Sequence, residues 1–302
     1  MQQLAIIIPY YKIKYFKETL ESLEQQSCKK FTLYIGNDAS PNDPKSLIDD
    51  VLKTTKYTYF SYTENLGGKD LVAQWERVIS ETDNENWLQI LGDDDVLSLK
   101  FVEEFYKHLD EIDEVGSNVI KFPQRWIDGN GEPFKEYTQQ PKLLSALDNW
   151  KEKYIKANRS SLSEHIFRRA TYEKIGFKHL PLAWGSDDLA VFEIAGEKPV
   201  FFIGEAQVEV RISAENISGS RELYVDKQRL AIAFETDFIN QHYKLLPKDY
   251  LKDRINQQIS FAFHHHISDL RLNLAKYYWY LGEYKKILKL PYTYWKILTK
   301  KP

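Results

Sequence analysis

Short apolar runs alternate with helix-spaced apolar positions through the first 122 residues. The runs have the length of strands buried on both faces, and they cover 4–8, 31–35, 57–62, 87–91 and 118–122. Between them, apolar residues recur at helical spacing over 16–23, 44–52, 69–79 and 101–109. This order predicts an α/β fold whose mostly parallel, Rossmann-like sheet is flanked by helices. Pro9, which lacks a backbone N–H, is expected to end the first strand.

The pattern changes after residue 122. Asp128-Gly129-Asn130-Gly131 is a strong turn signal and predicts the tip of a hairpin. From there to residue 222, strand-like segments at 165–167 and 208–210 are mixed with a helix-like segment at 189–195, and from 223 onward the pattern is helical. We therefore expect one domain over 1–222, with halves at about 1–122 and 123–222, and a helical C-terminal extension over 223–302.

Polar residues cluster where the predicted strands end. In an open α/β sheet, ligands bind outside the carboxyl ends of the strands. The run Asp93-Asp94-Asp95 directly follows a buried strand, where three crowded carboxylates are costly. A divalent cation such as Mg²⁺ or Mn²⁺ would remove that cost, because hard ions prefer carboxylate oxygens. A solvated acidic turn is the alternative that the run alone leaves open.

Composition limits the class of protein. The chain has 302 residues, 43% of them hydrophobic, and a net charge of −3, which argues against a general nucleic-acid partner. Cys28 is the single cysteine, so neither an intrachain disulfide nor a cysteine-based zinc site fits. There is no signal-peptide pattern and no run of about 18 apolar residues. We expect a cytoplasmic protein.

Several motifs follow one another in a fixed order. They are Ile8-Pro9-Tyr10-Tyr11, Asn37-Asp38-Ala39-Ser40, Asn65-Leu66-Gly67, Gly92-Asp93-Asp94-Asp95, Ser186-Asp187-Asp188, and Arg211 with Asn216-Ile217-Ser218. Over about residues 4–220, this series resembles glycosyltransferase family 2, whose nucleotide-sugar-binding fold is called GT-A. Four positions depart from the family pattern, with Lys12 for Asn, Asn37 and Gly92 for Asp, and Ser213 for His. These departures leave the expected fold intact but weaken any inference about the donor base and the metal affinity.

The resemblance implies a binding site for a nucleotide-sugar, most simply a UDP-sugar. Asp38 would accept a hydrogen bond from the uracil ring, and Pro9 and Tyr11 would shape the pocket for the base. The turn containing Asn65 and Gly67 would lie beside the nucleotide. Asp93 would assist through the ribose or water, and Arg211 would contact the diphosphate. For Asp38 the competing interpretation is a turn carboxylate, and for Arg211 it is an ordinary salt bridge.

The resemblance also implies inverting, metal-dependent transfer. Asp94 would be the direct ligand of Mn²⁺ or Mg²⁺, assisted by Asp95. Asp188 would be the general base that deprotonates an acceptor hydroxyl, with Asp187 as the alternative. Trp184 would stack on an acceptor sugar. The competing interpretation of the Asp187-Asp188 pair is the acidic first turn of a helix.

The C-terminal segment 270–302 is basic and aromatic. It contains eight Lys or Arg and one acid, Glu283, for a local charge of +7, together with eight Tyr or Trp. Basic helices with Trp and Tyr suit an anionic membrane surface, which would place the protein on the inner face of the membrane near lipid-linked acceptors. A helical subdomain whose aromatics pack against the first domain is the equal alternative. Nucleic acid also binds basic aromatic surfaces, but nothing in the rest of the chain supports it as a partner.

These observations predict sugar transfer to a hydroxyl of a glycan or lipid-linked acceptor, in cell-surface polysaccharide synthesis. One rival is a sugar nucleotidyltransferase-like enzyme, which would need a Gly-rich, basic phosphate loop that residues 9–12 do not supply. The other rival is a non-catalytic protein that binds nucleotide or glycan on the same fold.

Overall fold

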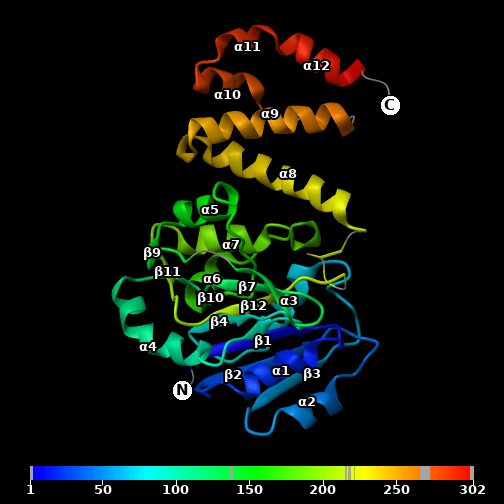
Figure 1. The fold of residues 1–302 in the computed structure, drawn as a ribbon, viewed down its shortest axis with the longest axis vertical. Helices are drawn as coiled ribbons and strands as arrows, with labels where there is room; N and C mark the ends of the chain where they lie inside the picture. The colour runs from blue at the N-terminus through cyan, green and yellow to red at the C-terminus, as the bar shows by residue number, and fades with distance from the viewer. Residues whose placement is uncertain are drawn as a thin grey trace. The chain divides into compact units, whose positions relative to one another are not determined.

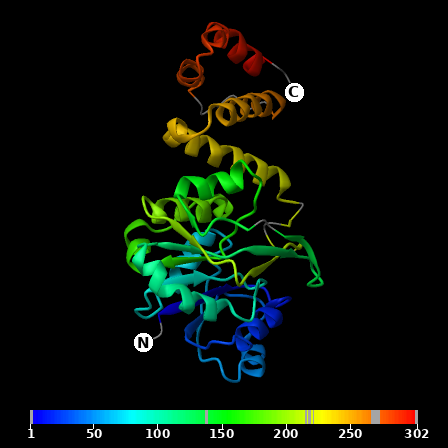
Figure 2. The ribbon, with the colours of Figure 1, turned by 60° about the vertical axis from the view of Figure 1, so that its left-hand side comes forward.

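The computed structural model describes residues 3–136, 139–214, 216, 219–220, 222–265 and 273–299. The chain forms two compact units, residues 1–223 and 224–302. The first unit combines strands and helices, whereas the described residues of the second are helical (Figure 1 and Figure 2).

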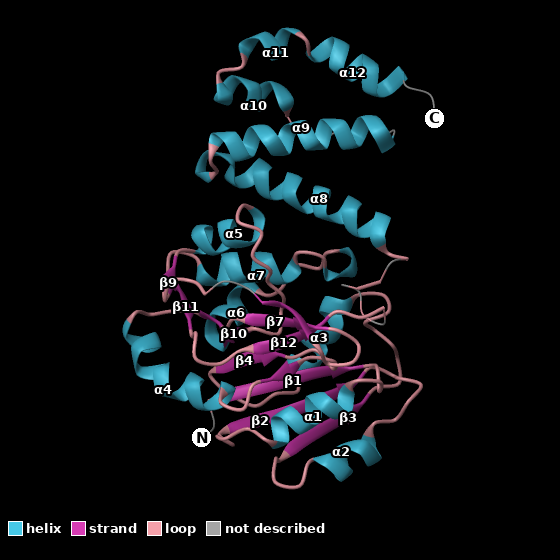
Figure 3. Ribbon diagram, viewed as in Figure 1, coloured by secondary structure: helices cyan, strands magenta, loops and turns pink. Residues whose placement is uncertain are grey.

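The centre of the first unit is an eight-stranded sheet (Figure 3). Its order is β3 (Tyr57–Ser61), β2 (Phe31–Asn37), β1 (Leu4–Tyr10), β4 (Trp87–Ile90), β10 (His165–Arg168), β6 (Val119–Lys121), β11 (Val200–Phe202) and β9 (Leu143–Leu144). The pairs among β3, β2, β1 and β4 are parallel. β10 runs antiparallel to both β4 and β6, and β9 is antiparallel to β11. The predicted α/β class with a mostly parallel sheet is confirmed.

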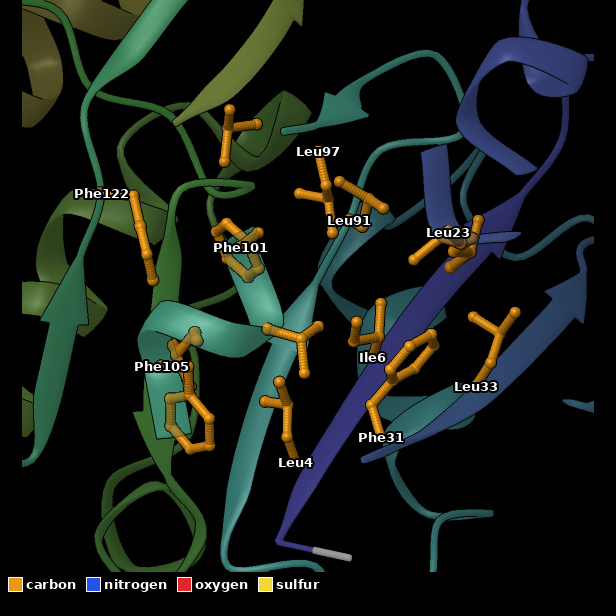
Figure 4. Close-up of a cluster of buried hydrophobic side chains, with 14 of the residues drawn as sticks. Leu4, Ile6, Leu23, Phe31, Leu33, Leu91, Leu97, Phe101, Phe105 and Phe122 are labelled. Carbon is orange, nitrogen blue, oxygen red and sulfur yellow. The ribbon is translucent and has the colours of Figure 1, made fainter. Parts of the chain in front are cut away.

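Helices cover both faces of this sheet, as the alternation of side chains along β1 requires. Leu4, Ile6 and Ile8 pack in one cluster with α1 (Phe16–Glu24), α2 (Lys45–Val51) and α4 (Phe101–Glu114), part of which Figure 4 shows. Ala5 and Ile7 pack in a second cluster with α3 (Leu71–Ile79), α6 (Arg169–Ile175) and α7 (Ser186–Ala195). Burial on both faces explains why the run at 4–8 lacks polar alternation.

The expectation that Pro9 ends the first strand is wrong, because β1 continues to Tyr10. The Ile7 carbonyl accepts from Leu91 on the β4 side, whereas the Tyr10 carbonyl accepts from Asp38 on the β2 side. Alternate residues face alternate neighbours, so the missing N–H of Pro9 faces the β4 side. Pairing with β4 has already ended there, at Ile7, and no ladder hydrogen bond is lost.

A second, four-stranded sheet lies in the order β5 (Val96–Leu97), β12 (Val208–Arg211), β7 (Gln124–Ile127) and β8 (Pro133–Glu136). β7 and β8 are antiparallel, which confirms the predicted hairpin. Asp128 forms its turn, because its side-chain Oδ1 accepts from the backbone N of Asn130 at 2.8 Å and of Glu132 at 3.0 Å. Because β5 follows the acidic turn, this sheet brings residue 211 beside residues 94 and 95.

Among the described elements of the first unit, the helices α5 (Ala146–Tyr154) and α6 and the strands β5, β9 and β11 have no counterpart in the predicted pattern. The helix expected at 189–195 begins earlier, at Ser186, and is preceded by the 3-10 turn η1 (Pro181–Ala183). The second unit contains α8 (Tyr224–His242), η2 (Tyr243–Leu245), α9 (Lys248–His265), α10 (Leu274–Leu281), α11 (Tyr284–Leu288) and α12 (Leu290–Thr299). Within the described part of the chain, none of the helices has the length and apolarity to span a bilayer.

Candidate active site

The acidic turn after β4 is tied directly to the turn after β1. Asp93 Oδ2 accepts hydrogen bonds of 2.7 Å from the backbone N of Tyr11 and of 2.7 Å from that of Lys12. The Tyr11 carbonyl in turn accepts 2.6 Å from the Ser40 hydroxyl, which follows β2. The carboxyl ends of three neighbouring strands therefore form one continuous hydrogen-bonded edge, as the topology requires.

The three acidic side chains of this turn face different partners. Asp94 Oδ2 accepts 3.1 Å from the Asn216 side-chain amide. Asp95 accepts at one oxygen from the Ser163 hydroxyl and at the other from the backbone N of Arg211, the latter at 2.9 Å. Both Asp95 oxygens thus hold the surrounding chain in place. Of the two predicted metal ligands, Asp94 has the geometry better suited to direct contact with an ion.

The turn concentrates negative charge that water screens poorly. Burial, together with the charge of Asp94, raises the pKa of Asp93 to about 7 and that of Asp95 to about 8. Burial also raises the pKa of Asp94. Carboxylates with this donor chemistry suit Mg²⁺ or Mn²⁺ shared with phosphate oxygens, rather than a cage made of protein alone. The acidic turn therefore fits the metal that the resemblance implies.

Among the described residues, a different set has three ligand atoms within 4.8 Å of one another, namely Glu104, His108 and Glu205. Glu104 and His108 lie on α4, and Glu205 follows β11. Lys107 pairs with Glu104 at 3.0 Å, so that carboxylate already has a cationic partner. The metal site at the acidic turn stays a prediction.

Asp38 fixes the turn that contains Asn65 and Gly67. Its two oxygens accept from the backbone N of Leu66 at 2.7 Å and of Gly67 at 2.8 Å, and the Arg77 guanidinium pairs with it. Asp38 is only 3% exposed, and a Cβ on Gly67 would lie 2.7 Å from Asp38 Oδ2. The structure thus favours the interpretation of Asp38 as a turn carboxylate, and its contact with a base stays a prediction.

Two further predicted residues of the nucleotide site lie at the same edge. Tyr11 has 36% of its surface exposed, so its ring is accessible for packing on a base. Pro9 pairs with Gly36 near the end of β2. Asn65 caps its own turn, because its Oδ1 accepts 2.6 Å from the backbone N of Gly68.

Arg211 is fully buried and donates to three groups of the protein. Its guanidinium binds the Asp94 carbonyl at 3.0 Å and the Asp128 carbonyl at 2.8 Å, and it pairs with Glu18. The side chain is 0% exposed. The internal ion pair is therefore the better interpretation of Arg211, and its predicted contact with the diphosphate is not favoured by this arrangement.

Asp187 and Asp188 lie in the first turn of α7, as the competing interpretation of this pair also expects. Asp188 accepts two hydrogen bonds of 2.7 Å from the Lys153 ammonium and one of 2.5 Å from the Tyr154 hydroxyl. Burial and the neighbouring Asp188 raise the pKa of Asp187 to about 7. Trp184 is half-buried and directly precedes Gly185, the N-cap of α7, whose φ is 87°.

The segment 160–164 contacts the acidic turn directly and Asp188 of α7 through Lys153. The Ser163 hydroxyl binds Asp95 and accepts from the backbone N of Gly92 at 3.1 Å, while the Ser160 carbonyl accepts 3.0 Å from Lys153. Burial is the largest cause of the raised pKa values of Asp95 and Asp187, and the negative charge of Glu164 raises both pKa values further. One short segment thus places the acidic turn and the start of α7 around a common site.

Sequence reasoning missed the residues that hold the acids in place. Lys153 and Tyr154 lie on a helix that was not predicted, and Ser163 and Glu164 precede a strand without any motif of their own. The fully buried Glu164 binds the Gln124 side chain at 3.0 Å and the Ser160 hydroxyl at 2.8 Å. A charged residue beside the apolar run 165–167 was the single available signal.

Comparison with known families and proteins also identifies a glycosyltransferase. A model described as Glycosyl transferase family 2 matches residues 5–176. A curated relative, the teichoic acid poly(glycerol phosphate) polymerase of Staphylococcus epidermidis, is 28% identical over 162 residues, which are 52% of this chain and 20% of the relative. The chain thus spans about a fifth of the length of that protein.

Solved structures share the fold. S. aureus TarS residues 1–349 in complex with UDP-GlcNAc gives a TM-score of 0.62 at 18% identity, over 86% of this chain and 73% of that one. A longer S. aureus TarS structure gives 0.58 at 17% identity, over 91% of this chain and 47% of that one. At these identities the likeness concerns the fold.

Proposed function

The chain belongs to glycosyl transferase family 2, and on that premise we propose that it transfers a sugar from a UDP-linked donor to a hydroxyl of a cell-surface glycan acceptor. The donor class is supported by the TarS structure that contains UDP-GlcNAc. The acceptor class is supported by the teichoic acid polymerase among its relatives. We therefore propose teichoic acid synthesis as the setting.

The observation that carries this proposal is the hydrogen-bonded edge that joins the ends of β1, β2 and β4. Tyr11 and Asp93 meet there through the 2.7 Å contact, beside the turn fixed by Asp38. We propose that the nucleoside binds at this edge, because ligands of open α/β sheets bind outside the carboxyl ends of the strands. Asp94 would hold Mn²⁺ or Mg²⁺ together with the diphosphate. When bound, this ion stabilises the negative charge of the leaving diphosphate.

Asp188 is the proposed general base. The acceptor O–H bond breaks as its proton moves to the Asp188 carboxylate, and the acceptor oxygen bonds to the anomeric carbon. The bond from that carbon to the diphosphate breaks on the opposite face, and its electron pair leaves with UDP. Attack opposite the leaving group inverts the anomeric configuration. A positioned base contributes a factor of about 10²–10⁴ to the rate.

We also propose that the second unit meets an anionic membrane, where lipid-linked acceptors reside. Five exposed large apolar side chains lie on α10 to α12, those of Trp279, Tyr284, Leu288, Tyr292 and Trp295. Lysines 276, 285, 286 and 296 lie on α10 to α12, and Lys289 lies between α11 and α12. Exposed aromatics among lysines suit the interface of anionic lipids, which supports a peripheral location on the inner face of the membrane.

A donor screen tests the proposed function. The full chain would be incubated with UDP-, GDP- and dTDP-sugars, with Mn²⁺, Mg²⁺ or chelator, and the release of nucleoside diphosphate would be followed. We expect nucleoside diphosphate to be released from a UDP-sugar and from none of the other donors. The rate of release should fall at least about 100-fold in Asp188→Asn, and release should stop when the chelator is added. UDP binding without any release, with or without glycan acceptors, would instead support a non-catalytic binding protein.

A further inference from the structure

We infer that Lys153 is a positioning residue, which orients the Asp188 carboxylate for removal of the acceptor proton. This inference rests on the proposed function. Lys153 lies on α5, and its ammonium reaches both oxygens of Asp188 at 2.7 Å. The two side chains are largely buried, with 21% and 10% exposed.

The hydrogen bonds around Asp188 leave room for one more. An ionised carboxylate offers about four lone-pair positions. Two are taken by Lys153 and one by the Tyr154 hydroxyl at 2.5 Å, so one acceptor position on Oδ1 remains. A cavity of about 10 Å³, room for roughly one water, is lined by Asp188, Lys153 and Tyr154. The space beside the Asp188 carboxylate therefore has room for about one hydroxyl group.

Lys153 stays protonated although it is buried. Burial lowers its pKa, but the negative charges of Asp188 and Asp187 raise it, and the net result lies above the ordinary value. The other ionisable groups near the pair are Lys121 on β6, Glu152 and Tyr154 on α5, and Glu164 and His165 at β10. Burial and the charge of Lys121 lower the pKa of His165 to about 3, so His165 stays neutral. Lys153 is therefore the cation that directly pairs with Asp188.

Lys153 also links the proposed base to the donor side. Its ammonium donates 3.0 Å to the Ser160 carbonyl, and three residues later Ser163 binds Asp95. Asp95 is fixed by the backbone N of Arg211 as well. The base and the acidic turn are thus held by one segment of chain, which keeps the acceptor hydroxyl and the donor in a constant relation.

Removal of the ammonium has a specific consequence. Without it, Asp188 would lie beside Asp187 with no direct counter-charge, and two neighbouring carboxylates without a cation disfavour the charged state. The loss would therefore affect turnover and its pH dependence, while the nucleotide site at the ends of β1 and β2 would remain.

The test compares Lys153→Met and Lys153→Arg with a matched control, Lys151→Met. Lys151 lies on the same helix, and its ammonium pairs at 2.9 Å with Asp148, whose side chain is 53% exposed. The probe is UDP release from UDP-GlcNAc with Mn²⁺, measured across pH with water as acceptor. UDP binding by calorimetry and unfolding by denaturant are measured on the same proteins.

In Lys153→Met we expect kcat to fall at least about tenfold and the acidic limb of kcat/KM to move up by about 1 pH unit. KM and the Kd for UDP should stay within about twofold, and Lys153→Arg should recover most of kcat. The inference would be overturned if Lys153→Met kept the kcat and the pH profile of the wild type. It would also be overturned if kcat and the affinity for UDP fell equally. If the wild type released no UDP from any UDP-sugar, with or without glycan acceptors, the proposed function itself would be overturned, and the inference with it.

Discussion

The Nε of Arg211 donates a hydrogen bond of 3.0 Å to the backbone carbonyl of Asp94. Its own backbone N donates 2.9 Å to Asp95. One buried residue of β12 therefore fixes both the backbone and a side chain of the acidic turn after β4. Hydrogen bonds from β12 thus hold the acidic turn in its conformation, and the acidic side chains need no hydrogen bonds to one another.

Arg211→Met should lower the free energy of unfolding by about 2–3 kcal/mol, because it leaves buried carbonyls and the Glu18 carboxylate without their donor. Denaturant unfolding measures this change. Arg125→Met is the control, since Arg125 pairs with Glu209 in the same sheet at 28% exposure and should cost less than about 1 kcal/mol. Equal costs for the two variants would contradict the assigned role of Arg211.

Gly67→Ala should weaken UDP binding. The added Cβ would meet Asp38 Oδ2 at 2.7 Å, so the turn or the carboxylate must move. Overpacking of this kind costs about 1–3 kcal/mol, which we expect to appear in both stability and UDP affinity. Calorimetry with UDP and Mn²⁺ measures the affinity, and wild-type affinity in a folded Gly67→Ala would show that this turn lies away from the nucleotide.

His179 gives a pH-dependent link between α3 and the segment before α7. Its two ring nitrogens lie 2.6 Å from Asp70 and 3.1 Å from Glu76, and the hydrogen bond to Asp70 and then that to Glu76 raise the pKa of His179. A raised pKa stabilises the fold fully below the unfolded value of about 6.5, and this stabilisation is lost as pH rises through the folded value.

The cost of His179→Gln should therefore be larger at pH 5.5 than at pH 8.5. Because the side chain is 45% exposed, water screens the pair, and we expect a difference of about 0.5 kcal/mol. Urea unfolding at the two pH values measures it. A cost that does not change with pH would mean that the charged form of His179 contributes nothing.

The full chain should bind vesicles that contain phosphatidylserine and should not bind vesicles of phosphatidylcholine alone. Trp279→Ser with Trp295→Ser removes two side chains that are 69% and 58% exposed, and it should lower the affinity at least tenfold. Higher salt should weaken binding, because lysines contribute to it. Sedimentation with vesicles measures the bound fraction, and equal binding to both lipid compositions would contradict an electrostatic contribution.

The sequence was sufficient to predict a strand or helix where a single periodic pattern of apolar residues specifies it. Leu4 to Ile8 form a strand buried on both faces, and that burial leaves a continuous apolar run. The order of strand ends then placed Tyr11, Asp38 and Asp93 at one edge, because parallel strands end together. The fold class follows from these two facts, and so does the predicted position of the nucleotide site.

The sequence was insufficient where a residue acts through a distant partner. Asp38 and Arg211 were predicted to face a ligand, yet both are buried against the protein itself. The pairing of Lys153 with Asp188 joins residues 35 positions apart on helices whose packing no local pattern reveals. Side-chain partners depend on tertiary packing, and one sequence does not specify them through propensity or spacing.

We propose above all that the acidic turn holds the metal and the diphosphate of a UDP-sugar. Calorimetric titration of UDP into wild type and Asp94→Asn, each with Mn²⁺ and with chelator, tests it most directly. We predict that Mn²⁺ strengthens UDP binding to the wild type at least tenfold and leaves Asp94→Asn unchanged. Equal strengthening in the two proteins would contradict the claim and place the metal elsewhere.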